Sequence, residues 1–195
     1  MKKAKQSMST KTMVLAGVMT SLVIVFQLLA VFTTFFGPFS TAIALVPIII
    51  GAALCGPIIG AWLGFVFSIV VIATGGANLF FIFSIFGTIV TVIAKGTLCG
   101  FVAGWVYKAL KNVNDVFAVI LASIACPVTN TAVFLLGSLT FFYKDAETIG
   151  AQVGIPGAGF AVFWGLAMAN FIFELVMCLV LSPVVLKLIN VRNKQ

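Results

Sequence analysis

The residue around which a binding site could form is Lys95, near the middle of the apolar run from Ser84 to Lys108. Bare hydrocarbon strongly disfavours an ammonium group, so a lysine at this depth must face the bundle interior, water or a bound ligand. At helical spacing, Thr91, Thr88 and Ser84 lie on the same face as Lys95. The run therefore predicts a polar stripe that leads from the middle of a membrane toward one mouth.

Glu174 is the second ionisable residue within a long apolar run. Asn170 lies one helical turn before it, and Ala167 and Phe163 continue the same face. In one interpretation, Lys95 and Glu174 form a structural ion pair that neutralises both charges inside the bundle. In the other, Lys95 faces a cavity and receives an anionic or strongly polar group of a ligand, while Glu174 orients Lys95 or accepts from ligand donors. The sequence favours the second interpretation and leaves the first open.

A third polar residue, Asn130, follows Pro127 in another apolar run. Its amide could recognise an amide or hydroxyl group of a ligand, or could join two helices. Gln27 and Tyr143 are weaker candidates that fit packing or an interface better. The predicted substrate-binding residues are Lys95, Asn130, Asn170, Glu174, Thr91, Thr88, Trp164 and Asn78.

The elements that must position these residues are membrane-length helices. Of the 195 residues, 63% are hydrophobic and only 8% are charged, whereas soluble domains carry about 25% charged residues. Because roughly 20 apolar residues cross a bilayer, we expect a single all-α membrane domain over residues 1–195, a compact bundle of six transmembrane helices. The predicted spans are residues 12–35, 40–55, 58–74, 80–108, 116–142 and 159–189, with residues 79–83 as a separate short element or the start of the fourth span.

Basic residues predict the orientation of this bundle. With both termini in the cytoplasm, nine basic residues lie inside and only Lys144 lies outside, beside Asp145 and Glu147. Such an asymmetry is the positive-inside pattern of multi-pass membrane proteins. The inner set is Lys2, Lys3, Lys5, Lys11, Lys108, Lys111, Lys187, Arg192 and Lys194.

The sequence lacks the residues and motifs typical of metal binding, redox chemistry, nucleotide binding and hydrolysis. The chain has four cysteines, no CxxC pair and no histidine, so we expect no metal, no cofactor and four buried thiols that act as small hydrophobic groups. Phosphate-binding loops and hydrolase motifs are missing as well. The chain is therefore not expected to be an enzyme. A membrane assembly partner whose Lys95 and Glu174 only join helices remains an alternative.

Small residues recur every four positions on three of the predicted helices, a spacing that lets helices approach closely. Some of these ladders must pack the bundle, and a remaining groove would suit another membrane subunit. The ladders comprise Gly56, Gly60 and Gly64, then Gly96, Gly100 and Gly104, and finally Ala16, Gly17, Thr20 and Ser21 in the first span.

These features resemble the substrate-binding S component of energy-coupling factor (ECF) vitamin transporters, over essentially the whole chain. The start of the first span, AGVMTS, is similar to the family's Ala-x-x-x-Ala docking motif, although Thr20 stands at the second alanine position. The segment ALVPIIIGAALCGPIIGAWLGFVFSIVV resembles the family's second and third spans, and the pantothenate-specific members most closely.

The resemblance implies a subunit of the bacterial cell membrane with an outward-facing pocket among spans four, five and six, covered by the first and third loops. It implies partners, a transmembrane coupling protein and two ATPase subunits, which the first span would contact through Ala16, Gly17, Thr20 and Ser21. ATP hydrolysis in those partners would topple the loaded subunit. Pantothenate is the expected substrate because a site lysine suits a small acid with hydroxyl and amide groups. Riboflavin, folate, hydroxymethylpyrimidine and niacin are the alternatives.

Overall fold

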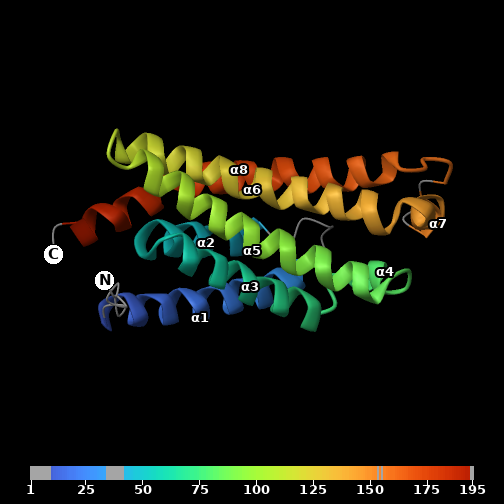
Figure 1. Ribbon diagram of the computed structural model, residues 1–195, viewed down its shortest axis with the longest axis horizontal. Coiled ribbons are helices and arrows are strands. Elements are labelled where there is room, and N and C mark those ends of the chain that lie inside the picture. The colour runs from blue at the N-terminus through green and yellow to red at the C-terminus, as the bar shows by residue number, and fades with distance from the viewer. Residues whose placement is uncertain (1–9, 34–41, 153, 155, 194–195) are drawn as a thin grey trace, which may run out of the picture.

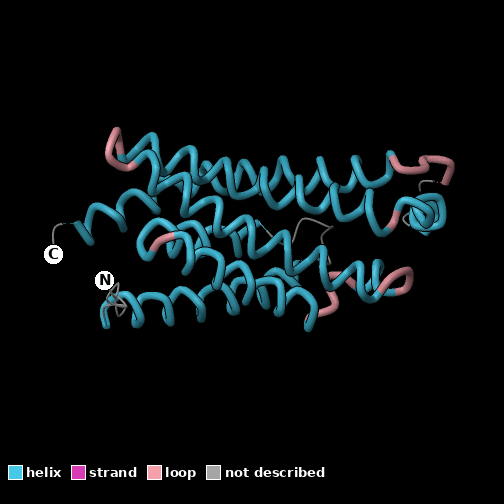
Figure 2. The backbone as a smooth tube through the Cα atoms, in the orientation of Figure 1, coloured by secondary structure: helices cyan, strands magenta, loops and turns pink. Residues whose placement is uncertain are grey.

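The computed structural model describes residues 10–33, 42–152, 154 and 156–193, and every element in these ranges is helical (Figures 1 and 2). Four helices are long and apolar enough to cross a membrane, namely α1, α5, α6 and α8, and α2 and α3 are shorter apolar helices. The elements are α1 (Thr10–Thr33), α2 (Ala42–Cys55), α3 (Pro57–Ala73), α4 (Asn78–Phe81), α5 (Ile85–Leu110), α6 (Asp115–Phe141), the 3₁₀ helix η2 (Tyr143–Asp145), α7 (Ala146–Gln152) and α8 (Ala161–Asn193).

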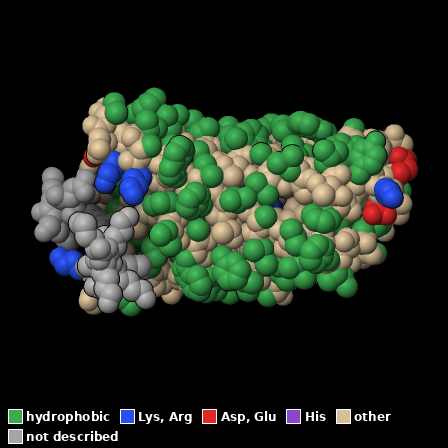
Figure 3. All heavy atoms as spheres, in the orientation of Figure 1, with side chains coloured by type: hydrophobic (Ala, Val, Ile, Leu, Met, Phe, Trp, Pro, Cys, Tyr) green, Lys and Arg blue, Asp and Glu red, His purple; other side chains and the backbone are tan. Residues whose placement is uncertain are grey.

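The helices run back and forth along the long axis, so the bundle has two distinct ends (Figure 1). At one end α1 begins, α5 turns into α6 and α8 ends; we call it the basic end, because Lys11, Lys108, Lys111 and Lys187 belong to these segments. The other, the α7 end, holds α4, η2 and α7. Basic and acidic side chains lie together at the α7 end, and a wide apolar band separates the two ends (Figure 3).

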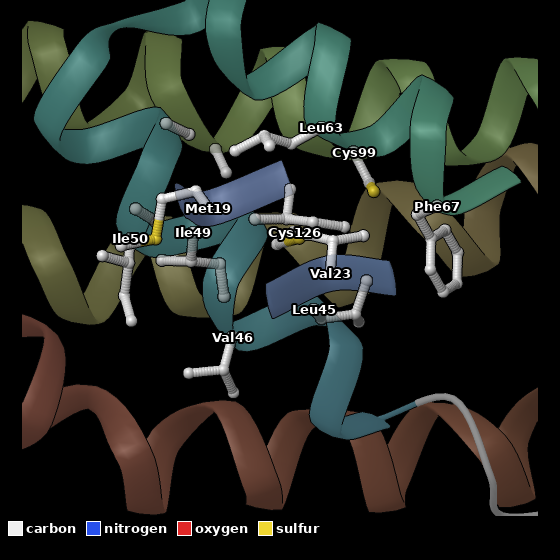
Figure 4. Close-up of a cluster of buried hydrophobic side chains, with 14 of the residues drawn as sticks. Met19, Val23, Leu45, Val46, Ile49, Ile50, Leu63, Phe67, Cys99 and Cys126 are labelled. Atoms are coloured by element: carbon white, nitrogen blue, oxygen red, sulfur yellow. The ribbon is translucent and has the colours of Figure 1, made fainter. Parts of the chain in front are cut away.

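The shortest of the apolar helices, α2, lies at the centre of the bundle. At about 1.5 Å per residue its 14 residues span about 21 Å, less than the roughly 30 Å of a bilayer core. Residues 44–52 are all buried, and α2 contacts α1, α3, α5, α6 and α8. A helix that is apolar all round is stable only where neighbours cover it on every side. In Figure 4, Leu45, Val46, Ile49 and Ile50 share one cluster with side chains of α1 and α3.

Two of the glycine ladders pack against each other where α3 crosses α5. A Cβ atom on Gly60 would overlap the carbonyl oxygen of Gly100, and one on Gly64 would overlap that of Gly96. The contact continues one turn further, where the Ser68 hydroxyl donates to the Val92 carbonyl at 2.8 Å. These glycines therefore serve internal packing and bring the two backbones into direct contact.

The fourth predicted span, residues 80–108, corresponds to two helices. The chain leaves α4 at Phe81 and begins α5 at Ile85, because the Ser84 side chain accepts the backbone N–H of Gly87 at 3.1 Å and so caps α5. The segment between the last two predicted spans contains η2 and α7.

Some predicted features fall outside the described residues. They are the end of the first span and the start of the second, most of the first loop, and Lys2, Lys3, Lys5 and Lys194. The count of six transmembrane helices and the cytoplasmic termini stay predictions.

Candidate functional site

A buried polar layer forms where α5, α6 and α8 meet. The Glu174 side chain of α8 is fully buried, and its carboxylate accepts hydrogen bonds from two asparagines. The Asn130 amide nitrogen of α6 donates to both carboxylate oxygens, at 3.1 and 3.0 Å. The Asn170 amide nitrogen, one turn earlier on α8, donates to Oε1 at 2.7 Å. Bonds to a charged acceptor are stronger than neutral ones, so this cluster fixes α6 against α8.

Lys95 reaches the same level of the bundle from α5. Its Nζ lies 5.6 Å from the centroid of the Phe134 ring, and Phe134 is one turn along α6 from Asn130. A ring face attracts a cation, which helps to hold an ammonium away from bulk water. The carboxylate of Glu174 carries the opposite charge and attracts the Lys95 ammonium. Lys95, Asn130, Asn170 and Glu174, which the sequence singled out, therefore come together from three helices.

Two buried atoms of this layer have no hydrogen-bond partner among the described residues. They are the carbonyl oxygen of Asn130, whose side chain is 3% exposed, and the hydroxyl of Thr91, which is 4% exposed. Thr91 lies one turn from Lys95 and packs against Gly137 of α6. Buried polar groups almost always have a partner, so these atoms are candidates for contact with a ligand or with water.

An aromatic cluster covers the polar layer on the side of the α7 end. Phe80 of α4 lies 5.7 Å from Phe134 and 5.3 Å from Phe142, measured between ring centroids. Phe163 of α8 completes the contact at 6.4 Å from Phe134. The sequence predicts Phe163 on the face of Asn170 and Glu174, but it did not identify Phe80, Phe134 or Phe142 as its neighbours. For Phe134 the available signal was its helical spacing from Asn130.

Three thiols lie on the opposite side of the polar layer. Cys99, Cys126 and Cys178 are each four residues from Lys95, Asn130 and Glu174 respectively, and all three are free and buried. The Cys99 thiol donates to the Gly96 carbonyl at 3.1 Å. Small polarizable side chains thus close the base of the site without adding charge.

The remaining predicted site residues lie apart from this layer. The hydroxyl of Thr88, although buried, donates to the Ser84 carbonyl at 2.7 Å. Asn78 is exposed at the first residue of α4 and lies against Gly75. Trp164 is 52% exposed on the surface of α8.

A carboxylate at the α7 end ties the loop before α8 to α7. The Glu147 oxygens accept the backbone N–H groups of Gly157 at 2.7 Å and Gly159 at 3.1 Å. Both glycines have positive φ angles, 81° and 51°, which point the two N–H groups toward one carboxylate. Phe160 follows directly, and its ring lies 5.2 Å from that of Phe163 in a tilted arrangement, so this loop contacts the aromatic cluster.

A shallow groove of about 510 Å³ lies on the outer surface between α1 and α3. The Thr20 hydroxyl donates to the Ala16 carbonyl at 2.8 Å and the Ser21 hydroxyl to the Gly17 carbonyl at 3.2 Å, so both are satisfied within α1. A Cβ atom on Gly17 would meet no atom within 4 Å. The groove is lined by Met13, Ala16, Gly17, Thr20, Ile59 and Trp62.

Comparison with protein-family models places residues 11–186 in one family, described as the ECF transporter, substrate-specific component. The chain belongs to this family. Its members are the substrate-binding membrane subunits of transporters, they partner with an energy-coupling module, and they are not enzymes. A search of curated proteins found no match. A search of solved structures found none either.

Proposed function

We propose that the polar layer between α5, α6 and α8 is the substrate site of this ECF subunit, and that the substrate is a small water-soluble vitamin. The observation that carries the proposal is the cluster of buried Asn130 and Glu174 with half-buried Lys95 and Asn170 in a chain of this family. A polar cluster beneath aromatic rings suits a small ligand with a few polar groups.

Pantothenate is the vitamin that this chemistry fits best. Its carboxylate complements the ammonium of Lys95, while its amide and hydroxyl groups suit asparagine partners. Thiamine, a cation, would meet Lys95 with like charge. Riboflavin, folate, hydroxymethylpyrimidine and niacin are the alternative substrates.

The substrate would enter from the α7 end and leave toward the basic end. The positive-inside asymmetry of the sequence supports a cytoplasmic basic end, with both termini inside a bacterial cell. Glu147 and the loop that it ties down would then cover the outer mouth.

The groove between α1 and α3 is the proposed contact with the transmembrane coupling protein, which in turn binds two ATPase subunits. Ala16, Gly17, Thr20 and Ser21 supply a surface of small side chains whose hydroxyls are already satisfied. Such surfaces let a partner helix approach closely within a membrane.

A thermal-shift titration of the detergent-purified chain tests the substrate assignment. A ligand that binds only the folded state increases the free energy of unfolding by RT ln(1 + [L]/Kd) and so raises the melting temperature. We expect pantothenate to raise it and the other B vitamins to leave it unchanged. A shift with a different vitamin would retain the binding function and reject pantothenate. Absence of a shift with every vitamin would favour a membrane assembly partner.

A further inference from the structure

The orientation of the Asn130 amide is fixed by Glu174. An asparagine side chain has an NH₂ donor on one side and a carbonyl acceptor on the other, whereas a carboxylate only accepts. The Asn130 nitrogen lies 3.1 and 3.0 Å from the two Glu174 oxygens. The reverse orientation would place the amide oxygen against both carboxylate oxygens, where they would repel one another. The nitrogen must therefore face Glu174.

It follows that the carbonyl oxygen of Asn130 points away from Glu174. This oxygen is buried and has no partner among the described residues, although a buried carbonyl is rarely left unpaired. Phe134, one turn away, lies under the Lys95 ammonium, and the unpartnered Thr91 hydroxyl faces α6 from α5. The polar layer thus includes a cation, an acceptor oxygen without a partner among the described residues and a hydroxyl that can either donate or accept a hydrogen bond.

We propose that Asn130 selects substrates that carry an N–H or O–H donor close to an anionic group, and that Glu174 acts as a positioning residue by holding the Asn130 amide. This inference rests on the proposed function and narrows its substrate class to hydroxy or amido acids. Pantothenate belongs to that class. Nicotinate does not, because its deprotonated carboxylate and ring nitrogen only accept hydrogen bonds.

The first test removes donors from the ligand without adding bulk. Wild-type protein is titrated with pantothenate, with the ester analogue that has oxygen in place of the amide nitrogen, and with the two analogues that each lack one hydroxyl. Loss of the donor to Asn130 leaves a buried acceptor unpaired, so one of these analogues should bind at least about tenfold more weakly than pantothenate.

The second test removes the orientation of Asn130. A glutamine in the Glu174→Gln variant both donates and accepts, so the Asn130 amide can turn over and present either side. The preference for pantothenate over the weakest analogue should fall to less than about threefold in this variant. A purely structural role of Glu174 would change all affinities by a common factor and keep the preference. The matched control is Asp115→Asn, which removes a carboxylate at the basic end.

The outcomes separate this inference from the proposed function. Equal binding of pantothenate and all three analogues would overturn the donor requirement while leaving a vitamin-binding subunit. Nicotinate as the tightest ligand would do the same. If another vitamin that carries N–H or O–H donors binds best, these donors are removed one at a time. At least one of the resulting analogues should again bind about tenfold more weakly. Failure of every vitamin to bind would reject both proposals.

Discussion

At the scale of single residues, the hydrogen bonds of the polar layer converge on Glu174. Glu174 accepts hydrogen bonds from two asparagines, whereas the Lys95 ammonium lies over the Phe134 ring. A cation–π contact of this kind contributes about 0.5–2 kcal/mol. The ammonium consequently has donor capacity left for a ligand.

Replacing Lys95 by Met tests which partner the ammonium serves. Methionine keeps an unbranched side chain and removes the charge, so we expect substrate affinity to fall by about 10- to 100-fold, the loss of a charge-assisted hydrogen bond. The melting temperature of the free protein should stay within a few degrees of wild type. Calorimetric titration and a thermal melt of the same preparation measure the two quantities.

The alternative of a structural ion pair makes the opposite prediction for Lys95→Met. Removing one member of a buried pair leaves an uncompensated charge and costs about 3–5 kcal/mol of stability. A strongly destabilised variant whose residual folded fraction binds normally would support that alternative. Lys144→Met, at an exposed position of the α7 end, is the matched control.

The charged half of the layer could be predicted from the sequence because ionisable residues are rare in apolar runs. Lys95 and Glu174 stand out against their surroundings. Asn170 lies one helical turn from Glu174, and Asn130 is a polar residue in another apolar run. The aromatic half could be predicted only for Phe163, which shares a helix face with Asn170 and Glu174, since Phe80 and Phe134 are two of 20 phenylalanines. Contacts between residues far apart in the chain decide which of them cover the site.

At the scale of elements, the α3–α5 contact determines where Lys95 sits. Gly96 follows Lys95 directly and its carbonyl meets Gly64, so the height of the ammonium in the bundle depends on this crossing. The four-residue spacing predicted two ladders that can pack closely. It did not show that they pack on each other, because spacing within one helix carries no information about its partner. The sequence also could not predict that α2 lies at the centre of the bundle, since an apolar helix can face either protein or lipid.

A methyl group at the α3–α5 crossing should therefore destabilise the bundle. In Gly64→Ala the new Cβ would overlap the backbone carbonyl of Gly96, which cannot move as a side chain can. Overpacking of this kind costs about 1–3 kcal/mol, or roughly 2–10 °C in melting temperature for a chain of this size. Thermal unfolding in detergent measures it.

The control for this prediction is Gly17→Ala on α1. A Cβ atom there meets nothing within 4 Å, so the substitution should be neutral or stabilise the helix by up to about 1 kcal/mol. Equal melting temperatures of the two variants would contradict the close contact between α3 and α5.

At the scale of the whole molecule, the proposed substrate site and the proposed partner surface lie on different helices. The polar layer lies between α5, α6 and α8, whereas the groove lies between α1 and α3. Helix α2 contacts all five of these helices, and α3 also packs directly on α5. This separation lets the chain bind its substrate alone and still depend on a partner for transport. Binding and uptake can then be affected by different substitutions, which gives the proposed docking surface a clear test.

A bulky residue in the groove should block uptake and spare binding. Gly17→Leu places a branched side chain in open space on α1, so the chain should fold and bind its vitamin as wild type does. A partner helix that packs on Gly17 would lose about 1–3 kcal/mol to the clash, and uptake by cells that express the complete transporter should drop about tenfold or more. Gly165→Leu is the matched control, since Gly165 of α8 is equally open but distant in sequence from the groove. Equal uptake by the two leucine variants would place the coupling protein on another face, and loss of vitamin binding in Gly17→Leu alone would mean that the groove and the polar layer are not independent.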